Sequence, residues 1–512
     1  MIAPRQYDLS DDRVVVVIGS GAGGGTLANE LARKGIDVVC LEAGGRLTLA
    51  DVVNDAPLMD ERMGWHDERR GAGVWLCKTV GGTTMRWSGV CPRFLAHEFR
   101  ARTTYGAMDD TTLIDWPLTL EELEPYYDKA EAKMGVSGTN GLPPSAENNN
   151  FKVLKAGARG IGYTDITTSH IAINPVPYDG RPGCQQIGFC NQGCAIGAKW
   201  STLYTEIPKA EQTGHFELRT NAMAIRINHD ERGQVVSVVY ADQDGILREQ
   251  KARAVCVACN VVETTRLLLL SESSLFPDGL ANSSGHLGKN YMRHLAEGVR
   301  AVMPGPVNQH RGARQAGFIR DEHTHDPVRG FAGGYLMELS GASAASFSRY
   351  AGWGGDAQRW MENFSYGAGL FLCGEDPPQE NNRISLHPTD KDELGLPIPV
   401  LEYSHHPNTK TMMRHAVAQG RELYSALGAT DIRDSSNRPG GGCHNMGVAR
   451  MSTDPSDGVT DRWGQAHDIP NLFISDGSVF STSGAPNPTL TIVALAIRQA
   501  DYIAERMARG TL

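Results

Sequence analysis

Two apolar runs near the start of the chain enclose a glycine-rich segment and a helical pattern. Residues 14–18 (VVVVI) are β-branched and apolar, and the glycine-rich segment 19–24 follows them directly. A second apolar run, residues 36–41, is followed directly by Glu42. Short apolar runs of this kind are typical of buried strands, and the residues between them repeat at helical spacing. The pattern therefore predicts strand, tight turn, helix and strand, which is the order of a dinucleotide-binding unit.

The chemistry of that unit assigns a task to each of four residues. Gly19 permits the sharp turn, Gly21 lets the backbone approach a pyrophosphate, and Gly24 lets the helix and strand pack closely. Glu42, at the end of the second strand, is placed to accept hydrogen bonds from ribose hydroxyls. We therefore predict a dinucleotide site. Nicotinamide enzymes and flavoproteins share this unit, so the glycines do not choose between them.

Further along the chain, the apolar pattern alternates between helical and strand-like segments. Residues 116–134 predict a helix, and residues 252–271 predict a buried strand followed by a helix, as in a nucleotide-binding domain. Residues 298–403 favour strands and long loops, within which the Gly-, Ser- and Ala-rich segment 333–355 predicts a mobile loop. Residues 488–507 predict a closing helix.

These patterns predict an α/β fold in which the nucleotide-binding domain is discontinuous. The expected division is residues 10–95, 201–297 and 435–512 for the nucleotide-binding domain, 96–200 for an insertion that carries a cysteine-rich loop, and 298–434 for the substrate domain.

Length and charge restrict the function class. A chain of 512 residues is too long for a single core. The formal net charge of −10 argues against a nucleic-acid partner, which needs a basic face. No apolar run approaches the roughly 18 residues needed to cross a membrane, and residues 1–13 lack the apolar core of a signal peptide. A soluble, loop-rich enzyme is the expected class.

Three cysteines lie within eleven residues of each other in a polar loop: Cys184, Cys190 and Cys194. Thiolates at this density suit a zinc ion, an iron–sulfur cluster or disulfides, and unligated thiols are a further alternative. Zinc would need a fourth ligand, which no nearby residue supplies, whereas a 3Fe–4S cluster takes one thiolate per iron. Elsewhere, the pair Cys256 and Cys259 is expected to be buried packing in an apolar strand.

Several histidines lie outside any recognisable motif. His323 and His325, in the polar stretch DEHTHD, are expected in a solvated loop. His405 and His406 are expected at the surface or at the end of a strand, with a place near the pocket as the alternative.

Four blocks in order carry a resemblance to a known family. They are GSGAGG (19–24) with Glu42, VGGTTMRWSG (80–89), NVVETTRLLLLS (260–271), and a carboxyl-terminal block made of CHNMG (443–447), NLFISDGSVF (471–480) and GAPNPTLTIVALA (484–496). In these blocks the chain resembles the glucose–methanol–choline family of flavin oxidoreductases over nearly its whole length. The resemblance implies bound FAD, a Rossmann-like FAD-binding domain and a substrate domain built on an antiparallel sheet.

The resemblance also implies a catalytic pair. His444 is the expected base that removes a hydroxyl proton while a hydride passes from carbon to flavin N5, and Asn487 is expected to hold the substrate oxygen. Histidine suits this task because its ordinary pKa lies near neutrality. Many relatives have a second histidine where this chain has Asn487, so His444 would act as base alone. FAD is expected to be noncovalent, because Arg86 stands where some sugar oxidases have the histidine that attaches the flavin.

Further FAD contacts are implied at positions that match the family's motifs. These positions are expected to supply small residues against the flavin, contacts to its phosphates and ribityl chain, and backbone beneath the isoalloxazine. They are Gly81, Gly82, Thr83, Ala224, Asp476, Gly477, Pro488 and Thr489.

Within the family, the chain looks most like the catalytic subunits of bacterial FAD-dependent glucose, gluconate and fructose dehydrogenases, through PYDGRPGC (177–184) and the cysteines that follow. These enzymes carry a 3Fe–4S cluster on cysteines at similar spacing, although some have a further cysteine where this chain has Gln185. Their partners are a small subunit that carries the export signal and a cytochrome c that accepts electrons. The implied location is the periplasm by way of such a subunit, or otherwise the cytoplasm.

The leading hypothesis is therefore an FAD-dependent dehydrogenase of a sugar, sugar acid or glycoside with a 3Fe–4S relay. An O2-using pyranose or glycoside oxidase with structural cysteines is the alternative within the family. An NAD-dependent dehydrogenase and a non-catalytic flavoprotein belong to other classes, and the carboxyl-terminal blocks with His444 and Asn487 argue against both. No motif identifies the substrate, and a small alcohol or a secondary alcohol of a glycosylated natural product is also compatible with the sequence.

Overall fold

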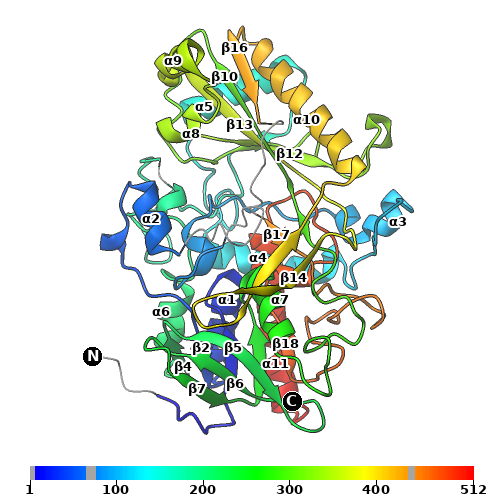
Figure 1. The fold of residues 1–512 in the computed structure, drawn as a ribbon. Coiled ribbons are helices and arrows are strands. Elements are labelled where there is room, and N and C mark those ends of the chain that lie inside the picture. The colour runs from blue at the N-terminus through cyan, green and yellow to red at the C-terminus, as the bar shows by residue number, and fades with distance from the viewer. Residues whose placement is uncertain (1–5, 65–75, 189, 436–443) are drawn as a thin grey trace.

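The computed structural model describes residues 6–64, 76–188, 190–435 and 444–512 (Figure 1). Two sheets lie at opposite ends of the molecule, one parallel and one antiparallel, with a belt of loops and short strands between them. None of the helices in the described ranges is both long and apolar enough to cross a membrane.

The parallel sheet has the strand order β18-β8-β1-β2-β4. Its strands are β1 (Val15–Ile18), β2 (Val38–Leu41), β4 (Phe216–Arg219), β8 (Ala254–Val257) and β18 (Leu472–Ile474). Strands β1, β2, β8 and β18 are buried along their whole length, as their continuous apolar sequences require in a sheet covered on both faces. The predicted discontinuous Rossmann-like sheet is confirmed, because the adjacent strands β8 and β18 come from before and after the antiparallel-sheet segment of the chain.

Helices cover this sheet. Helix α1 (Ala22–Arg33) follows the glycine turn and packs against α11 (Thr489–Ala508) and the short α6 (Glu206–Glu211). Helix α4 (Leu120–Met134) packs on α11. It begins at a capping box between Thr119 and Glu122 and ends at Gly135, whose φ of 67° places it in the left-handed region. The predicted helices in 116–134 and 488–507 are confirmed.

A three-stranded meander joins β4 to β8. It consists of β5 (Met223–His229), β6 (Val235–Ala241) and β7 (Leu247–Lys251). Helix α7 (Asn260–Leu270) follows β8, so the predicted strand and helix within 252–271 are also confirmed. Helix α7 packs against β5 and against a hairpin of β14 (Arg383–Lys391) and β15 (Pro397–Glu402).

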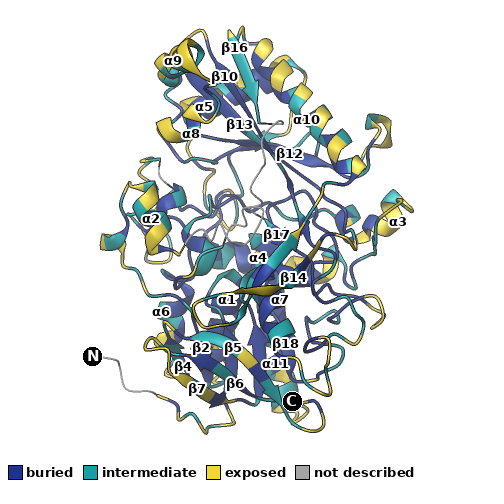
Figure 2. Ribbon diagram, in the orientation of Figure 1, coloured by how far each residue is buried: buried dark blue, intermediate teal, exposed yellow. Residues whose placement is uncertain are grey.

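The antiparallel sheet confirms the expected substrate-side architecture. Its order is β16-β10-β13-β12-β11-β3, formed by β3 (Ile166–Thr167), β10 (Leu295–Val302), β11 (Phe318–Ile319), β12 (Tyr335–Leu339), β13 (Gly367–Gly374) and β16 (Asp431–Asp434). Helices α5 (Asn149–Gly160) and α10 (Pro407–Ser425) contact each other and the sheet. In Figure 2 the inner strands β10, β12 and β13 are largely dark blue and the edge strand β16 is teal, whereas the outer side of α10 is largely exposed. The edge strand β3 comes from the 96–200 segment.

The expectation of a mobile loop at 333–355 is wrong. Strand β12 lies inside the sheet between β11 and β13, and every one of its residues is buried. Helix α8 (Ala344–Ser348) follows, and Phe347 stacks on Trp360 of α9 (Gly354–Glu362) with ring centroids 4.4 Å apart. Burial of these large side chains outweighs the local abundance of glycine and serine.

Two short strands connect the halves of the molecule. Strand β9 (Met292–Arg293) directly precedes β10, and it pairs with β17 (Asn445–Met446) in antiparallel register, Asn445 opposite Arg293. The remaining short helices, α2 (Ala56–Arg62) and α3 (Ala101–Tyr105), lie on the flanks (Figure 1).

Candidate active site

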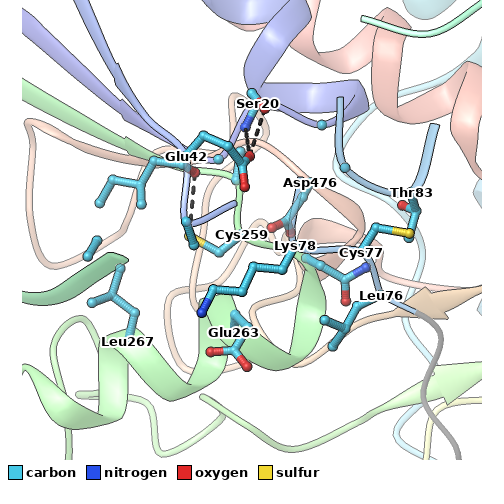
Figure 3. Close-up of a pocket in the computed structure, with 18 of the residues that line it drawn as sticks. Ser20, Glu42, Leu76, Cys77, Lys78, Thr83, Cys259, Glu263, Leu267 and Asp476 are labelled. Atoms are coloured by element: carbon cyan, nitrogen blue, oxygen red, sulfur yellow. Dashed lines mark hydrogen bonds between the residues drawn. The ribbon is translucent and has the colours of Figure 1, made fainter. Parts of the chain in front are cut away.

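A cavity of about 530 Å³ lies where β1, β2 and β8 end (Figure 3). Its walls are the glycine turn, the start of α7, the 3₁₀ helix Gly82–Met85, the 3₁₀ helix Gly477–Val479 and the turn of the β14–β15 hairpin. This is the carboxyl end of a parallel sheet, where α/β folds bind their ligands, and its size is in the range of ligand pockets.

The glycine turn has the geometry that its sequence predicts. Gly19 has a φ of 98°, and a Cβ there would lie 2.4 Å from the Ala258 carbonyl oxygen. A Cβ on Gly24 would lie 2.0 Å from the Gly19 oxygen, so only glycine lets the helix approach the strand. Gly21 faces the cavity, and a Cβ there would meet only Gly82, at 4.0 Å. Gly23, which the sequence did not single out, is closest of all, because its Cβ would lie 1.6 Å from the Ser475 oxygen.

The amino terminus of α1 presents free backbone donors to the cavity. Gly21 is the N-cap, it supplies no side-chain cap, and the first turn holds no acidic residue. The unpaired N–H groups and the positive end of the helix dipole favour an anion at this point. An open glycine wall beside an anion-binding helix terminus fits the dinucleotide that the sequence predicts.

Glu42 stands beside the glycine turn and is already hydrogen-bonded. Its Oε2 accepts from the Ser20 hydroxyl (2.7 Å) and backbone N–H (3.1 Å), and its Oε1 accepts from Gly44 N–H at 2.9 Å. Burial raises the pKa of this carboxyl, although these hydrogen bonds and the charge of Lys78 act in the opposite direction. Ser20 Oγ also accepts from Gly81 N–H at 3.0 Å, so Glu42 braces the two loops that form the cavity.

The opposite wall holds the other predicted cofactor contacts. The residues Gly82, Thr83, Ala224, Asp476 and Gly477 line the cavity. Asp476 accepts from the Thr264 hydroxyl at 2.6 Å and from Ser478 N–H at 2.8 Å, and it thereby joins α7 to the 3₁₀ helix that it caps. Four other predicted contacts, Gly24, Gly81, Pro488 and Thr489, are not among the described lining residues. Gly81 (φ 95°) turns the chain into Gly82, and Pro488 is the N-cap of α11.

Sequence reasoning missed several side chains of this cavity. Lys78 extends across it toward Glu263, and Cys77 and Cys259 lie on its walls (Figure 3). The Cys259 thiol donates to the Ile18 oxygen at 3.4 Å. Cys256 is buried in β8, as expected. Cys259, the other cysteine of the CxxC pair, lines the cavity instead of packing in the strand.

Arg266 of α7 binds the turn between β14 and β15, which forms part of the cavity wall. The guanidinium is 1% exposed, and it donates to Asp392 Oδ2 (2.6 Å) and to the Pro397 oxygen (2.8 Å). Glu393 and Leu396, in the same turn, line the cavity. No local signal marks this clamp, because its parts are 126 to 131 residues apart.

We expect Asp392→Ala to loosen this turn and to accelerate cofactor loss. Removing Asp392 leaves the buried guanidinium with the longer contact to Glu263 Oε2 (3.4 Å) as its remaining charged partner among the described residues. The expected cost is about 1–3 kcal/mol in the free energy of unfolding. The measurement is the rate at which flavin fluorescence appears after dilution. Asp390→Ala is the matched control, because this side chain lies on β14 and is 64% exposed; equal release rates for both variants would contradict the clamp.

The predicted catalytic pair is brought together beside the cavity. His444 directly precedes the cavity-lining Asn445, and its Nε2 lies 3.3 Å from Nδ2 of Asn487, which is buried. On the other side of the ring, His444 Nδ1 lies 2.8 Å from His294 Nδ1. Cys443, the neighbour of His444 in the CHNMG motif, lies outside the described residues.

A buried carboxyl, Glu338 of β12, lies next to this pair and was not foreseen. Burial raises its pKa to about 8, although contacts with Asn487, Cys373 and Gln315 act in the opposite direction. Its Oε2 accepts from the Gln315 amide at 2.9 Å. At neutral pH Glu338 is therefore largely a neutral acid, which can donate a hydrogen bond.

Burial, and secondarily the neighbouring His294, lowers the pKa of His444 well below its ordinary value of 6.5. The unprotonated form, which a base needs, therefore persists at acidic pH. We expect kcat/KM to stay within about twofold between pH 7.5 and 6, since an unshifted histidine would be about three-quarters protonated at pH 6.

The check is a kcat/KM profile with bound flavin assayed at each pH; a fall centred near pH 6.5 would contradict the expectation. The same depressed pKa favours unfolding in acid, because the unfolded chain binds a proton below about pH 6.5 that the folded chain excludes. Short assays separate this loss of stability from the titration of the base.

The three loop cysteines are free thiols gathered in one apolar cluster. Their sulfurs are not all within 4.8 Å of one another, so they do not form a single-ion site in the described structure. The Cys184 sulfur accepts from Gln186 N–H and the Cys194 sulfur accepts from Lys199 N–H, both at 3.4 Å. Burial raises the pKa of Cys184 to about 11 and also raises that of Cys190.

Lys199 connects this loop to the cavity wall. Its buried ammonium donates to the carbonyl oxygens of Cys190 (2.6 Å), Trp87 (2.7 Å) and Met85 (2.9 Å), and burial lowers its pKa to about 8. Met85 ends the 3₁₀ helix whose first two residues line the cavity. Arg86 pairs with Asp60.

The expectations for two histidines, His323 and His406, are wrong. His323 is 4% exposed, and its Nε2 lies 3.3 Å from Glu98 Oε1, so it is not in a solvated loop. His406 is the buried N-cap of α10. Its neighbour His405 lies 2.8 Å from the Tyr403 hydroxyl, and burial lowers its pKa to about 4. His323 escaped the prediction because its partner Glu98 lies 225 residues away in the sequence.

Comparison with known proteins gives a consistent result. The amino-terminal and carboxyl-terminal sequence profiles of the GMC oxidoreductases match residues 63–296 and 378–496. The chain is 33% identical to the 2-methyl-1,2-propanediol dehydrogenase of Mycolicibacterium austroafricanum, over 98% of this chain and 96% of that protein. It is 30% identical to the fructose dehydrogenase large subunit of Gluconobacter japonicus, over 97% and 98%.

Among solved structures, the pyridoxine 4-oxidase from Mesorbium loti superimposes with a TM-score of 0.70 over 96% of this chain and 99% of that one. At 16% sequence identity, this likeness shows the fold alone.

Proposed function

Because the chain belongs to the glucose–methanol–choline (GMC) oxidoreductase family, we propose that it oxidises a hydroxyl group of a sugar or a sugar derivative. Its class is that of an FAD-dependent oxidoreductase acting on CH–OH groups. The names of the two relatives describe one enzyme of a 1,2-diol and one of fructose. Both compounds carry adjacent hydroxyl groups, which supports a polyhydroxylated substrate.

The observation that carries the proposal is the pair formed by His444 and Asn487 beside a cofactor-sized cavity, which the adjacent Asn445 lines. When bound, FAD supplies the two-electron acceptor that alcohol oxidation requires. Gly21 and Gly82 leave room for it, and the start of α1 offers donors for its phosphates. His444 Nε2 takes the hydroxyl proton. Asn487 Oδ1, buried without a hydrogen-bond partner among the described residues, is available to a substrate hydroxyl.

Anaerobic mixing of the purified flavoprotein with single substrates tests this proposal. Loss of the flavin absorption band with glucose, gluconate or fructose, but not with their deoxy analogues, is the expected result. Bleaching by simple diols alone would show that the substrate is a small alcohol and not a sugar. Absence of a flavin spectrum in a folded preparation would overturn the proposal.

We further propose that Cys184, Cys190 and Cys194 hold a 3Fe–4S cluster that relays electrons to an external acceptor. Three free thiols, backbone N–H donors to two of their sulfurs, and the nearby cations of Lys199 and Arg314 support it. Such donors and cations are typical surroundings of cluster thiolates. Lys199 also places this loop against the cavity wall.

Iron and acid-labile sulfide assays with EPR, on protein kept from oxygen, test the cluster. About three irons per chain, lost in Cys190→Ser, are expected. Flavin without iron would make the cysteines structural and would favour direct reoxidation by O2, which an oxygen electrode measures.

The external acceptor in this proposal is a cytochrome c, reached in the periplasm with a small partner subunit. The name of the Gluconobacter relative, a large subunit, supports a multisubunit enzyme. Reduction of cytochrome c by the substrate-reduced protein, monitored optically, is the direct assay.

A further inference from the structure

Two histidines from opposite halves of the molecule meet through their Nδ1 atoms. The antiparallel ladder of β9 and β17 pairs Arg293 with Asn445, so the next position along it sets His294 opposite His444. The two Nδ1 atoms lie 2.8 Å apart, and the rings cross at 81°. One of these nitrogens must carry the proton of this contact and the other must accept it.

The surroundings of His294 decide which nitrogen accepts. Its Nε2 lies 3.3 Å from the Ser483 carbonyl oxygen, which can only accept a hydrogen bond. The proton of His294 is therefore on Nε2. A neutral imidazole carries one proton, so the Nδ1 of His294 is a bare acceptor.

Both rings are neutral at working pH. Burial lowers the pKa of His294 to about 4, against the opposing effect of the Ser483 and Gly484 backbone. Burial likewise lowers the pKa of His444, and the neighbouring His294 lowers it further. The contact between them consequently holds a single proton.

That proton belongs to His444 Nδ1, which leaves His444 Nε2 bare. The opposite edge of the ring agrees independently, because Nε2 lies 3.3 Å from the Asn487 amide nitrogen, which can only donate. The carbonyl that contacts His294 and the amide N–H that contacts His444 therefore require the same tautomer of His444, with the proton on Nδ1.

Cys373 lies beside the contact and is compatible with this assignment. Its sulfur is 3.2 Å from His294 Nδ1 and 3.4 Å from the Ala485 carbonyl oxygen. Its S–H proton can be donated to the Ala485 oxygen or to Glu338, which leaves the single lone pair of His294 Nδ1 to the N–H of His444.

We propose that His294 is a positioning residue that holds His444 in the tautomer whose bare Nε2 faces the substrate. This inference rests on the proposed function, in which His444 is the base. As the substrate O–H bond breaks and an N–H bond forms at His444 Nε2, the ring becomes an imidazolium. Its Nδ1–H bond to His294 is then charge-assisted and stronger, so His294 also stabilises the product of the proton transfer.

Two substitutions separate this role from packing. Asparagine places its Oδ1 near the position of the histidine Nδ1, so His294→Asn keeps an acceptor for His444, whereas His294→Leu keeps similar bulk without one. We expect His294→Leu to lower kcat by roughly 10- to 100-fold with KM nearly unchanged, since the altered interaction acts on the chemical step. His294→Asn should recover most of this loss, with equal flavin content in both variants.

A direct measurement does not depend on turnover or on the folding of a variant. In the oxidised protein labelled with ¹⁵N-histidine, long-range ¹H–¹⁵N spectra distinguish the two tautomers, and the His444 signals are those absent from His444→Gln. The proposal requires a protonated Nδ1 and an unprotonated Nε2 on His444. The reverse pattern, or a kcat of His294→Leu equal to that of the native enzyme, would overturn it.

These outcomes are distinguishable from a failure of the proposed function. If His444 is not the base, His444→Ala retains activity while the tautomer of His444 is still read from the spectrum. If only the role of His294 is wrong, His444→Ala is inactive and His294→Leu is not impaired.

Discussion

His444→Ala lowers kcat by roughly 10²- to 10⁴-fold while flavin stays bound, which is the loss expected for a general base. The reason is geometric. His444 Nε2 and the Asn487 amide are polar groups that face each other beside the cavity, and asparagine cannot take a proton. The carboxyls of Asp476 and Glu42, which line the cavity, are occupied by hydrogen bonds to their own loops.

Single-turnover reduction of the flavin under anaerobic conditions is the appropriate measurement, because it isolates the chemical step from reoxidation. Added imidazole should restore part of the rate, since the alanine variant leaves a ring-sized space at the site. His467→Ala is a control for the loss of a histidine elsewhere, as this ring contacts Ser452 outside the cavity. Flavin reduction at the native rate in His444→Ala would place the base on another residue.

Gly21→Val abolishes flavin binding without unfolding the protein. A Cβ at this position meets no atom closer than 4.0 Å, so the apoprotein accommodates the side chain, but that side chain enters the cavity wall beside Gly82. Gly23→Val is the contrasting variant. Its Cβ would lie 1.6 Å from the Ser475 oxygen, so α1 could not pack against the end of β18.

Flavin absorbance and thermal unfolding distinguish the two variants. Gly21→Val should unfold at the temperature of the native apoprotein, and it should lose the stabilisation that bound cofactor supplies, about 2.7 kcal/mol at a hundredfold excess over Kd. Gly23→Val should be misfolded or insoluble. Gly160→Val is the control, because the Cβ there has its nearest neighbour at 3.7 Å and lies far from the cavity in α5. Native flavin content in Gly21→Val would show that this wall does not contact the cofactor.

The parts of the protein that the sequence predicted are those whose signals are local. The turn at Gly19, the close approach at Gly24 and the acid at the end of β2 are set by a single unit of about thirty residues. The helix ends at Thr119 and Gly135 are likewise encoded by capping residues. His444 and Asn487 were reached only through resemblance to a family, because a histidine and an asparagine 43 residues apart carry no spacing of their own.

The parts that escaped prediction depend on contacts between distant segments. His294 meets His444 across 150 residues, and His323 reaches Glu98 across 225. The first contact follows from the register of β9 and β17, and the second from packing of two segments that are distant in the sequence. No local pattern reports either of them. The segment 333–355 was misjudged for the same reason, since β12 is ordered by its neighbours β11 and β13.

The strand order of the parallel sheet also governs how the chain acquires its structure during synthesis. Strand β8 can pair with β1 once Val257 has been made, yet its other edge is covered only by β18, at Leu472–Ile474. Between these two points of translation the nascent chain therefore exposes an apolar strand edge, which is a template for association with other chains. Asp476, which closes the cofactor cavity, emerges directly after β18. Protection from aggregation and the ability to load the cofactor are thus gained in the same late step, and release of a chain before residue 472 forfeits both.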